Sequence, residues 1–232
     1  MAQLEDLENG NYHFSFKLAV IGDVGVGKST LLTHHVQDDE IVDMSAEVER
    51  GYCADFLIKS YEKDGRKHVV QWWDIPGVER GDMSMVTRLC AGAAGGILVF
   101  DRDSPSSFES LGAWLAAAKQ GAVGGRPPQA HGAWALVANV IGIEAGESDG
   151  VSADVARDFA HQNGMEYFEM TGPSMEPFHQ ACFDVLSKVV SNIPDPPEPS
   201  LMLRQGIAVG GLLAADGRVR EALYKPPPQD GL

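Results

Sequence analysis

The chain has 232 residues, 44% of them hydrophobic, and its 33 acidic and 18 basic side chains give a net charge of −15. Nucleic acids and anionic membrane surfaces attract basic proteins, so this charge argues against either as a direct partner. The three cysteines are scattered, without the spacing of a disulfide framework or a metal site, which fits a reducing intracellular compartment. No apolar run reaches the length of a transmembrane helix, and the acidic N-terminus lacks the apolar core of a signal peptide.

Strands and helices alternate along most of the chain. After a polar N-terminal arm at 1–14, the apolar patterns predict strands at 15–21, 54–61, 67–74, 95–101, 134–139 and 165–170. They predict helices at 28–37, 104–119, 153–163 and 175–191, and Asp64-Gly65 predicts a hairpin turn between the second and third strands. This order is typical of an α/β fold in residues 15–192, with a mostly parallel six-stranded sheet and helices on both faces.

The last segment, residues 193–232, differs in composition from the rest. Its prolines near 194–199 and 226–228 exclude regular structure there. Between them, residues 201–224 are mildly apolar and contain Gly206, Gly210, Gly211 and Gly217. A fragmentary helix or partner-binding segment is one hypothesis and disorder is the other, and we expect this Pro-rich tail to be extended or disordered.

Residues 22–29 read G-D-V-G-V-G-K-S between a predicted strand and a predicted helix, which is the context of a phosphate-binding loop. Glycines let backbone N–H groups turn toward a phosphate, and the helix N-terminus adds partial positive charge. We expect Lys28 to reach the β- and γ-phosphates and the Ser29 hydroxyl to hold Mg²⁺. The expected phosphate-binding residues are Asp23, Val24, Gly25, Val26, Gly27, Lys28, Ser29 and Thr30. A loop that keeps its shape but has lost its ligand is the alternative.

A second motif, Trp73-Asp74-Ile75-Pro76-Gly77, follows a predicted strand that should lie in the same sheet. An aspartate at this place binds Mg²⁺, directly or through water. The backbone N–H of Gly77, three residues later, can meet a γ-phosphate. Asp74 and Ser29 are therefore the expected metal ligands.

With these motifs the chain resembles a Rab-type small GTPase of the Ras superfamily over about residues 14–192. The resemblance also rests on G-G-I-L-V-F-D at 95–101, L-V-A-N at 136–139 and F-E-M-T-G-P-S at 168–174. It implies a protein that binds GTP or GDP with Mg²⁺ and acts through protein partners. Asn139 stands where the family begins its Asn-Lys-x-Asp motif, and Thr171 and Gly172 stand in its Ser-Ala-Lys loop, so all three are expected near the base.

Three departures from the family concern hydrolysis. Alignment on Asp55-Phe56 puts Gly51 at the family's first-switch threonine, where Ser45 or another loop hydroxyl could substitute only with poor spacing. The family's water-orienting glutamine is replaced by Val78. Val24 stands where Ras-type proteins keep a glycine that admits an arginine finger. Loss of the water-orienting group leaves turnover very slow, so little intrinsic hydrolysis is expected and no catalytic residue is assigned. Whether the chain is an enzyme therefore stays open.

Base recognition departs from the family as well. The chain reads Asn139-Val140-Ile141-Gly142, without the lysine that packs on the base or the aspartate that reads guanine. Losing a buried bidentate pair of this kind costs roughly 10²–10⁵-fold in discrimination. Pro173 stiffens the last base loop, although the Gly172 N–H can still meet the base oxygen.

The last cysteine is Cys182, inside a predicted helix, so we expect neither a prenyl anchor nor direct membrane insertion. In this the chain resembles the non-prenylated Rab-like GTPases of intraflagellar transport. That resemblance implies a cytoplasmic protein, in a cilium or flagellum, that acts as a slow switch or structural subunit in vesicle or ciliary transport. The alternatives are a pseudo-GTPase scaffold that binds protein partners without turnover, and a P-loop protein that uses ATP or another nucleotide.

Two residue pairs deserve separate expectations. Trp72 and Trp73 lie next to each other on a strand, so they should face opposite sides of the sheet, and we expect helices to cover both. An exposed tryptophan there would instead mark a partner surface. His34 and His35 lack metal-ligand spacing and are expected on the surface of the first helix.

Overall fold

The computed structural model describes residues 9–37, 55–77, 83–122, 133–140, 150–170, 172–193 and 207–210. The strands are β1 (Phe14–Ile21), β2 (Asp55–Lys63), β3 (Arg66–Asp74), β4 (Ala93–Asp101), β5 (Ala133–Asn139), β6 (Glu166–Glu169) and β7 (Ile207–Val209). The helices are α2 (Lys28–Gln37), α3 (Met83–Leu89), α4 (Pro105–Glu109), α5 (Leu111–Ala122), α6 (Ala153–Gln162) and α7 (Glu176–Ser191). The residues singled out above that lie outside the described ranges are Ser45, Gly51, Val78, Ile141, Gly142, Thr171, Gly206, Gly211 and Gly217.

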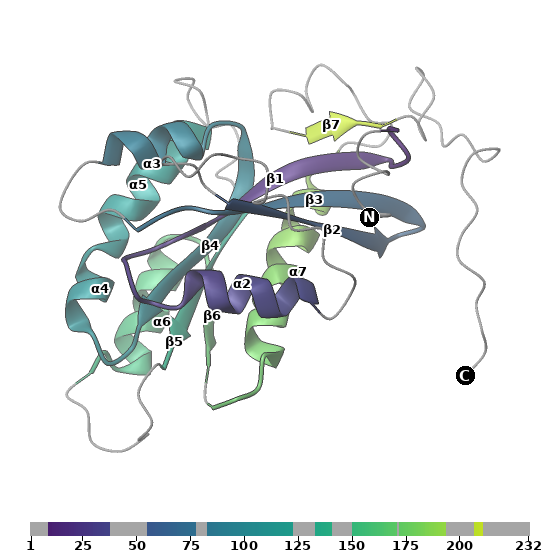
Figure 1. Cartoon of the computed structure of the whole chain (residues 1–232). Coiled ribbons are helices and arrows are strands. Elements are labelled where there is room, and N and C mark those ends of the chain that lie inside the picture. Colours follow the sequence, from purple (N-terminus) through teal and green to yellow (C-terminus); the bar gives the residue numbers. More distant parts are fainter. Residues whose placement is uncertain are drawn as a thin grey trace.

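The strands form one sheet in the order β2-β3-β1-β4-β5-β6 (Figure 1). β1, β3, β4, β5 and β6 pair in parallel, and only β2 in this path is antiparallel to its neighbour. The hairpin between β2 and β3 turns at Asp64 and Gly65, whose φ angles of 54° and 69° are both left-handed, as a type I′ turn requires. The predicted mostly parallel six-stranded sheet is thus confirmed, and β7 adds a further strand beside β1.

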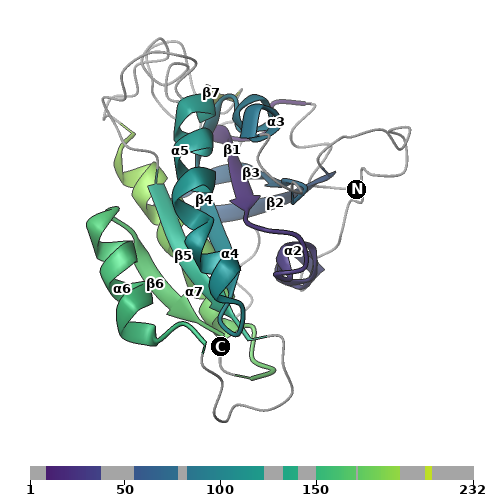
Figure 2. The same cartoon turned by 90° about the vertical axis from the view of Figure 1, so that its left-hand side faces the viewer.

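Side chains alternate between two cores, one on each face of the sheet. Along β1, Phe16, Leu18 and Val20 belong to the core under α2 and α7, and Ala19 and Ile21 belong to the other. Helices α3, α5 and α6 cover that second core, and Figure 2 shows α5 and α6 on their side of the strands. The prediction of helices on both faces is confirmed. Because β1, β3, β4, β5 and β6 run in parallel, their carboxyl ends and the loops that follow them lie at the same edge of the sheet.

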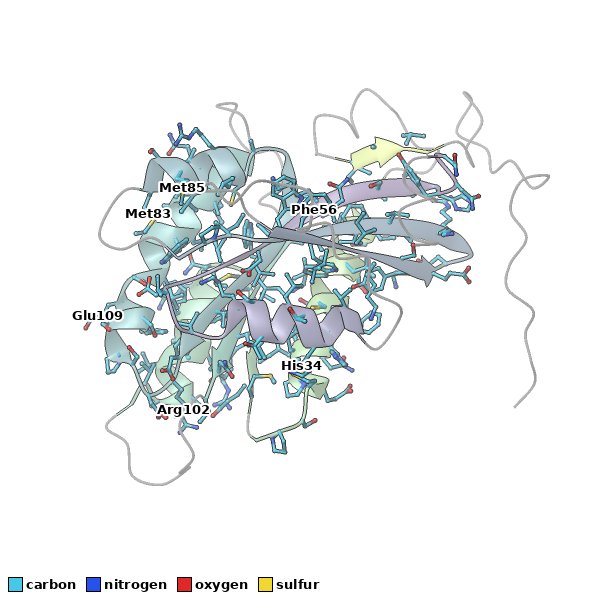
Figure 3. All side chains as sticks on the ribbon, viewed as in Figure 1. His34, Phe56, Met83, Met85, Arg102 and Glu109 are labelled. Atoms are coloured by element: carbon cyan, nitrogen blue, oxygen red, sulfur yellow. The ribbon has the colours of Figure 1, made fainter. Side chains whose placement is uncertain are left out.

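The first helix differs from expectation at one of its two histidines. His34 is exposed on the outer side of α2, as predicted (Figure 3). His35 is 1% exposed, so its placement on the surface was wrong. Its Nε2 lies 2.8 Å from the Tyr61 hydroxyl, and its ring meets Trp72 edge-on. The face of α2 that carries His35 lies against the sheet. Contacts with β2, β3 and α7, which are distant in the sequence, bury the side chain.

Other differences are local. The predicted helix at 104–119 divides at Ser110 into α4 and α5, and α3 was not predicted. Phe183 on α7 is 47% exposed, although it is a large apolar side chain. Trp72 is fully buried as expected, whereas Trp73 is only partly covered, with Phe56 stacked on it at 5.3 Å between ring centroids.

Candidate functional site

The loop at 22–27 leaves the carboxyl end of β1 and leads directly into α2. Two of its glycines are required by close approaches. Gly22 has a φ of 145°, and a Cβ there would lie 2.1 Å from the Val99 carbonyl oxygen. Gly27 has a φ of 89°, and a Cβ there would lie 2.4 Å from Nδ2 of Asn139. The backbone therefore has the tight, curled course that a phosphate-binding loop needs.

Lys28 crosses back over this loop. Its ammonium donates to the carbonyl oxygens of Gly22, at 2.9 Å, and Asp23, at 2.7 Å. An ammonium has three N–H donors, so one is left to meet a phosphate oxygen. The side chain is 6% exposed, and burial lowers the pKa of Lys28 while the carboxylates of Asp74 and Asp23 oppose that shift. The loop thus presents a buried cation at the start of a helix.

Ser29 and Asp74 meet beside the loop. The Ser29 hydroxyl donates to Oδ2 of Asp74, although the residues are 45 positions apart in the chain. Sheet register causes this contact, because Val20 pairs with Asp74 and the Ile75 N–H donates to the Val20 carbonyl at 3.0 Å. A hydroxyl and a carboxylate are the oxygen ligands that Mg²⁺ accepts, with water and phosphate completing its shell. These two residues therefore fit the metal they were expected to hold.

Among the residues that the structure describes, no set of three or more His, Cys, Asp and Glu side chains is placed to hold a metal ion. The metal expectation consequently depends on Ser29, Asp74 and the phosphate oxygens of a bound nucleotide.

Val24 and Gly77 lie in close contact across the site. A Cβ at Gly77 would be 2.5 Å from the Val24 backbone nitrogen and 2.6 Å from its Cγ2. Val24 is itself 61% exposed. The structure therefore brings the second motif against the phosphate-binding loop, with an apolar side chain at the open side of their junction.

Asp23 turns its carboxylate away from the loop's concave side. Oδ1 accepts hydrogen bonds from Ser110 Oγ at 2.9 Å and from Trp114 Nε1 at 2.6 Å. A carboxylate aimed at a phosphate would repel it, and these two donors from the start of α5 hold the charge elsewhere. Asp23 thus contributes to the loop through its backbone, and its side chain ties the loop to α5.

Asn139 braces the loop from the opposite side. Its Nδ2 donates to the Val26 carbonyl at 3.0 Å, which links the end of β5 to the loop. Gly172, in the loop after β6, is exposed and has a φ of 109°, a conformation that side chains strain. Asn139 therefore lies at the carboxyl end of β5, in contact with the loop, and Gly172 follows the carboxyl end of β6.

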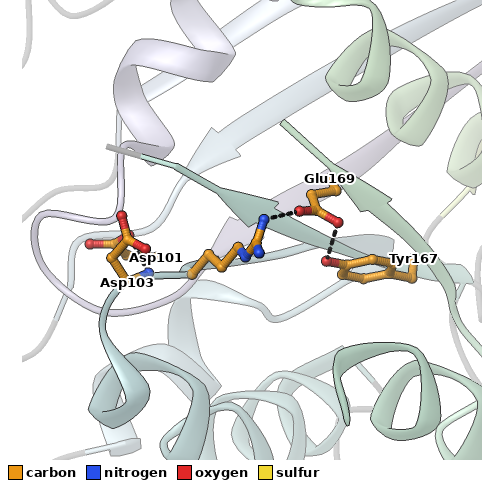
Figure 4. Close-up of polar contacts among 5 residues, drawn as sticks. Asp101, Asp103, Tyr167 and Glu169 are labelled. Atoms are coloured by element: carbon orange, nitrogen blue, oxygen red, sulfur yellow. Dashed lines mark hydrogen bonds and ion pairs between the residues drawn. The ribbon is translucent and has the colours of Figure 1, made fainter. Parts of the chain in front are cut away.

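A polar cluster that the sequence reasoning missed joins β4 to β6 across the end of β5 (Figure 4). The guanidinium of Arg102 donates to Glu169 Oε1 at 2.5 Å, and the Tyr167 hydroxyl donates to Oε2 at 3.2 Å. The Arg102 N–H donates to the Asn139 carbonyl at 2.8 Å. Burial, followed by the Glu169 charge, raises the pKa of Tyr167. The sequence carried one signal of this cluster: Arg102 directly follows β4, and Glu169 is the last residue of β6. Both strands lie beside β5 in the sheet.

No helix in the parts of the chain that the structure describes has both the length and the apolar composition needed to cross a bilayer.

Comparison with known proteins agrees with this geometry. The Ras family model matches residues 17–191. Ras-related protein Rab-13 of Bos taurus is 30% identical over 185 residues, which cover 76% of this chain and 83% of the relative. Ras-related protein Rab-10 of Caenorhabditis elegans is 28% identical over 79% of this chain and 85% of its own length. GTP-binding protein ypt3 of Schizosaccharomyces pombe is 26% identical over 80% and 82%. The chain belongs to the Ras family.

Proposed function

We propose that this protein is a Rab-like subunit or slow switch that binds GTP or GDP with Mg²⁺ and hydrolyses GTP weakly. The observation that carries the proposal is the meeting of Lys28, Ser29 and Asp74 around one glycine loop. A buried ammonium, a hydroxyl and a carboxylate at a helix start suit a nucleotide's phosphates and their metal ion. The printed names of the relatives, GTP-binding and Ras-related proteins, agree with this chemistry.

Weak hydrolysis is supported by three positions. Val78 has no polar side-chain atom that could orient an attacking water, and Gly51 has no hydroxyl for the first switch. These two arguments rest on residue identity in the sequence. Val24 adds a geometric argument, because its Cγ2 lies against Gly77 at the junction where an arginine from a partner would enter. We expect bound nucleotide to remain GTP for long periods.

The transport role rests on resemblance. The chain is similar to Rab proteins over most of its length, and the relatives are named as Rab-type. We place the protein in the cytoplasm, as a subunit of vesicle or ciliary transport that binds protein partners. A strongly acidic protein favours basic partner surfaces.

A scaffold that retains the fold without nucleotide is the second candidate. It is favoured by Val140, which stands where the family has a base-packing lysine. It is also favoured by the internal bonds that hold the loop, from Asn139 to Val26 and from Trp114 to Asp23, since neither requires a ligand.

A thermal-shift comparison tests the proposal. GTP or GDP with Mg²⁺, at about a hundredfold over Kd, should raise the unfolding temperature of the wild type by roughly 5–10 °C. Lys28→Ala should abolish that shift. Lys63→Ala is the matched control, because Lys63 lies at the β2–β3 hairpin turn, and it should shift as the wild type does. An equal shift in Lys28→Ala and the wild type would contradict binding at this loop.

A further inference from the structure

The first residues of β1 have an open side. β3 pairs with β1 from Phe14 onward, but β4 begins to pair only at Lys17. On the β4 side, the backbone of Phe14–Phe16 would therefore present unpaired hydrogen-bonding groups, as an edge strand does. β7 fills that place, and Figure 1 shows it beside the start of β1, away from α2.

The pairing is antiparallel and specific in register. Phe14 lies opposite Val209, and Phe16 lies opposite Ile207. The Gly210 N–H extends the ladder by donating to the His13 carbonyl at 2.9 Å. The side chain of Ile207 is 2% exposed and belongs to the same core as Phe14 and Phe16. β7 therefore covers both the backbone edge and the apolar side chains at the start of β1.

The four residues of this segment follow an alternating pattern. Ile207 is buried, Ala208 is exposed, and Val209 is partly buried. Gly210 is buried against Tyr12, where a Cβ would lie 2.0 Å from the carbonyl oxygen and 2.5 Å from the ring. Only glycine fits there. A segment that pairs with this edge therefore needs apolar residues at the positions of Ile207 and Val209 and glycine at the position of Gly210. The position of Ala208 faces solvent and accepts any side chain.

We propose that Phe14–Phe16 form a strand-accepting peptide site and that the chain's own residues 207–210 are the ligand that fills it. Main-chain hydrogen bonds supply affinity in such strand addition, and alternate side-chain positions supply specificity. Residues 194–206 tether the segment to α7, which ends at Ser191, so its local concentration is high. Without that tether a strand of only three residues would bind more weakly, so a free peptide of the same sequence should occupy the site only when the chain's own segment is displaced.

The site is separate from the phosphate-binding loop. It lies at the amino end of β1, and the loop follows the carboxyl end of this strand of 8 residues, roughly 23 Å away. The strand-accepting site therefore does not depend on the proposed nucleotide function, and its test uses no nucleotide.

Hydrogen–deuterium exchange on the full-length chain tests whether β7 is held as described. Ile207→Asp places a charge in the core. It should remove protection from the peptide that covers 207–210 and lower it in the peptide that covers 12–16, whose backbone stays paired with β3. Ala208→Asp adds the same charge on the exposed side of the same strand and should retain that protection. Gly210→Val, which clashes with Tyr12, should behave like Ile207→Asp. Wild-type exchange in both Ile207→Asp and Gly210→Val would overturn the proposal.

Binding in trans tests whether the vacated edge accepts a strand. A fluorescent peptide with the sequence of residues 205–212 should bind full-length Ile207→Asp or Gly210→Val and should not bind the wild type, whose site is filled. The same peptide carrying valine for Gly210 should not bind either variant. Release of β7 without any binding of the wild-type peptide would overturn the peptide site and leave β7 as a stabilising strand only.

Discussion

The indole N–H of Trp114 donates to the carboxylate of Asp23 over 2.6 Å, joining the phosphate-binding loop to α5. Trp114 is fully buried, and Ser110 donates to the same oxygen at 2.9 Å. Asp23 also accepts from Lys28 through its carbonyl. Asp23 thus holds Lys28 through its carbonyl on one side and contacts the core through its carboxylate on the other.

Removing this donor should weaken nucleotide binding. Trp114→Phe leaves the Asp23 carboxylate without its shortest hydrogen bond and held by Ser110, so the carboxylate turns toward the phosphates more readily. Hydrogen bonds to charged groups contribute about 1.5–3 kcal/mol, so we expect roughly a tenfold or greater loss of GDP affinity, measured by fluorescent nucleotide displacement.

Two variants separate this effect from loss of packing. Trp134→Phe is the control, because Trp134 is 2% exposed and its buried indole nitrogen has no hydrogen-bond partner among the residues that the structure describes. Its GDP affinity should stay near that of the wild type. Asp23→Asn in the Trp114→Phe background should recover part of the lost affinity, since the repelling charge is gone. Equal losses in Trp114→Phe and Trp134→Phe would contradict a role for the bond.

Because of Asn139, replacing Gly27 by alanine should destabilise the protein more than replacing Gly25 by alanine. Both glycines have similar left-handed φ angles, 89° and 84°, so alanine strains the backbone equally, by about 1 kcal/mol. Only at Gly27 would the new Cβ clash, 2.4 Å from Nδ2 of Asn139. We expect Gly27→Ala to lower the free energy of unfolding by about 1–3 kcal/mol more than Gly25→Ala in chemical denaturation. Equal losses of unfolding free energy in the two variants would show that the Asn139 side chain moves aside at no energetic cost.

The ion pair between Arg102 and Glu169 should stabilise the carboxyl ends of β4 and β6. The Glu169 side chain is 17% exposed and that of Arg102 is 40% exposed, so solvent screens the pair partly. We expect Arg102→Ala to cost about 1–2 kcal/mol of unfolding free energy and to speed GDP release. Asp154→Ala removes the exposed pair with Arg157 and leaves the Arg157 guanidinium over the Tyr167 ring, so it should cost at most about 0.5 kcal/mol. A cost for Arg102→Ala as small as that control would contradict the bracing role.

His35 should make the protein less stable in mild acid. Burial, with smaller contributions from Lys59 and His179, lowers the pKa of His35 to about 3 in the folded state. The unfolded chain binds this proton near pH 6.5, so it holds more protons than the folded chain between about pH 6.5 and 3. Stability must therefore fall as pH falls through that window, by up to about 1.4 kcal/mol per pH unit from this group.

Urea denaturation between pH 7 and 4.5 measures that slope. His35→Gln should reduce the slope of unfolding free energy against pH by the amount that corresponds to about one proton. His34→Gln, at the exposed neighbouring position, should leave that slope unchanged. His68, whose pKa burial lowers to about 4, supplies a remaining slope of the same sign. An unchanged slope in His35→Gln would mean that this histidine is protonated in the folded protein.

The phosphate site could be predicted from the sequence because its signals are local. The glycine spacing before Lys28 fixes the loop, and the run up to Ile21 fixes the strand before it. The pairing of Val20 with Asp74 then follows from parallel-sheet topology, which places the second motif beside the first. Asp64-Gly65 likewise sets its hairpin through the turn geometry that these two residues favour.

The remainder depends on contacts between distant segments. Arg102 and Glu169 are 67 positions apart, and only the order β4-β5-β6 brings them together. His35 is buried by the sheet and α7, which no pattern within α2 reports. Ile207–Val209 lie in a glycine-containing tail whose composition favours disorder, and pairing with β1 overrides that local preference.

The nucleotide content of gently purified protein tests the central claim most directly. Protein prepared in Mg²⁺ is denatured, and the released nucleotide is identified by anion-exchange chromatography. The account predicts close to one guanine nucleotide per chain, with GTP in excess of GDP because Val78 and Gly51 replace the hydrolytic residues. Absence of any nucleotide, together with no thermal shift on adding GTP, GDP or ATP, would contradict the account and favour the scaffold.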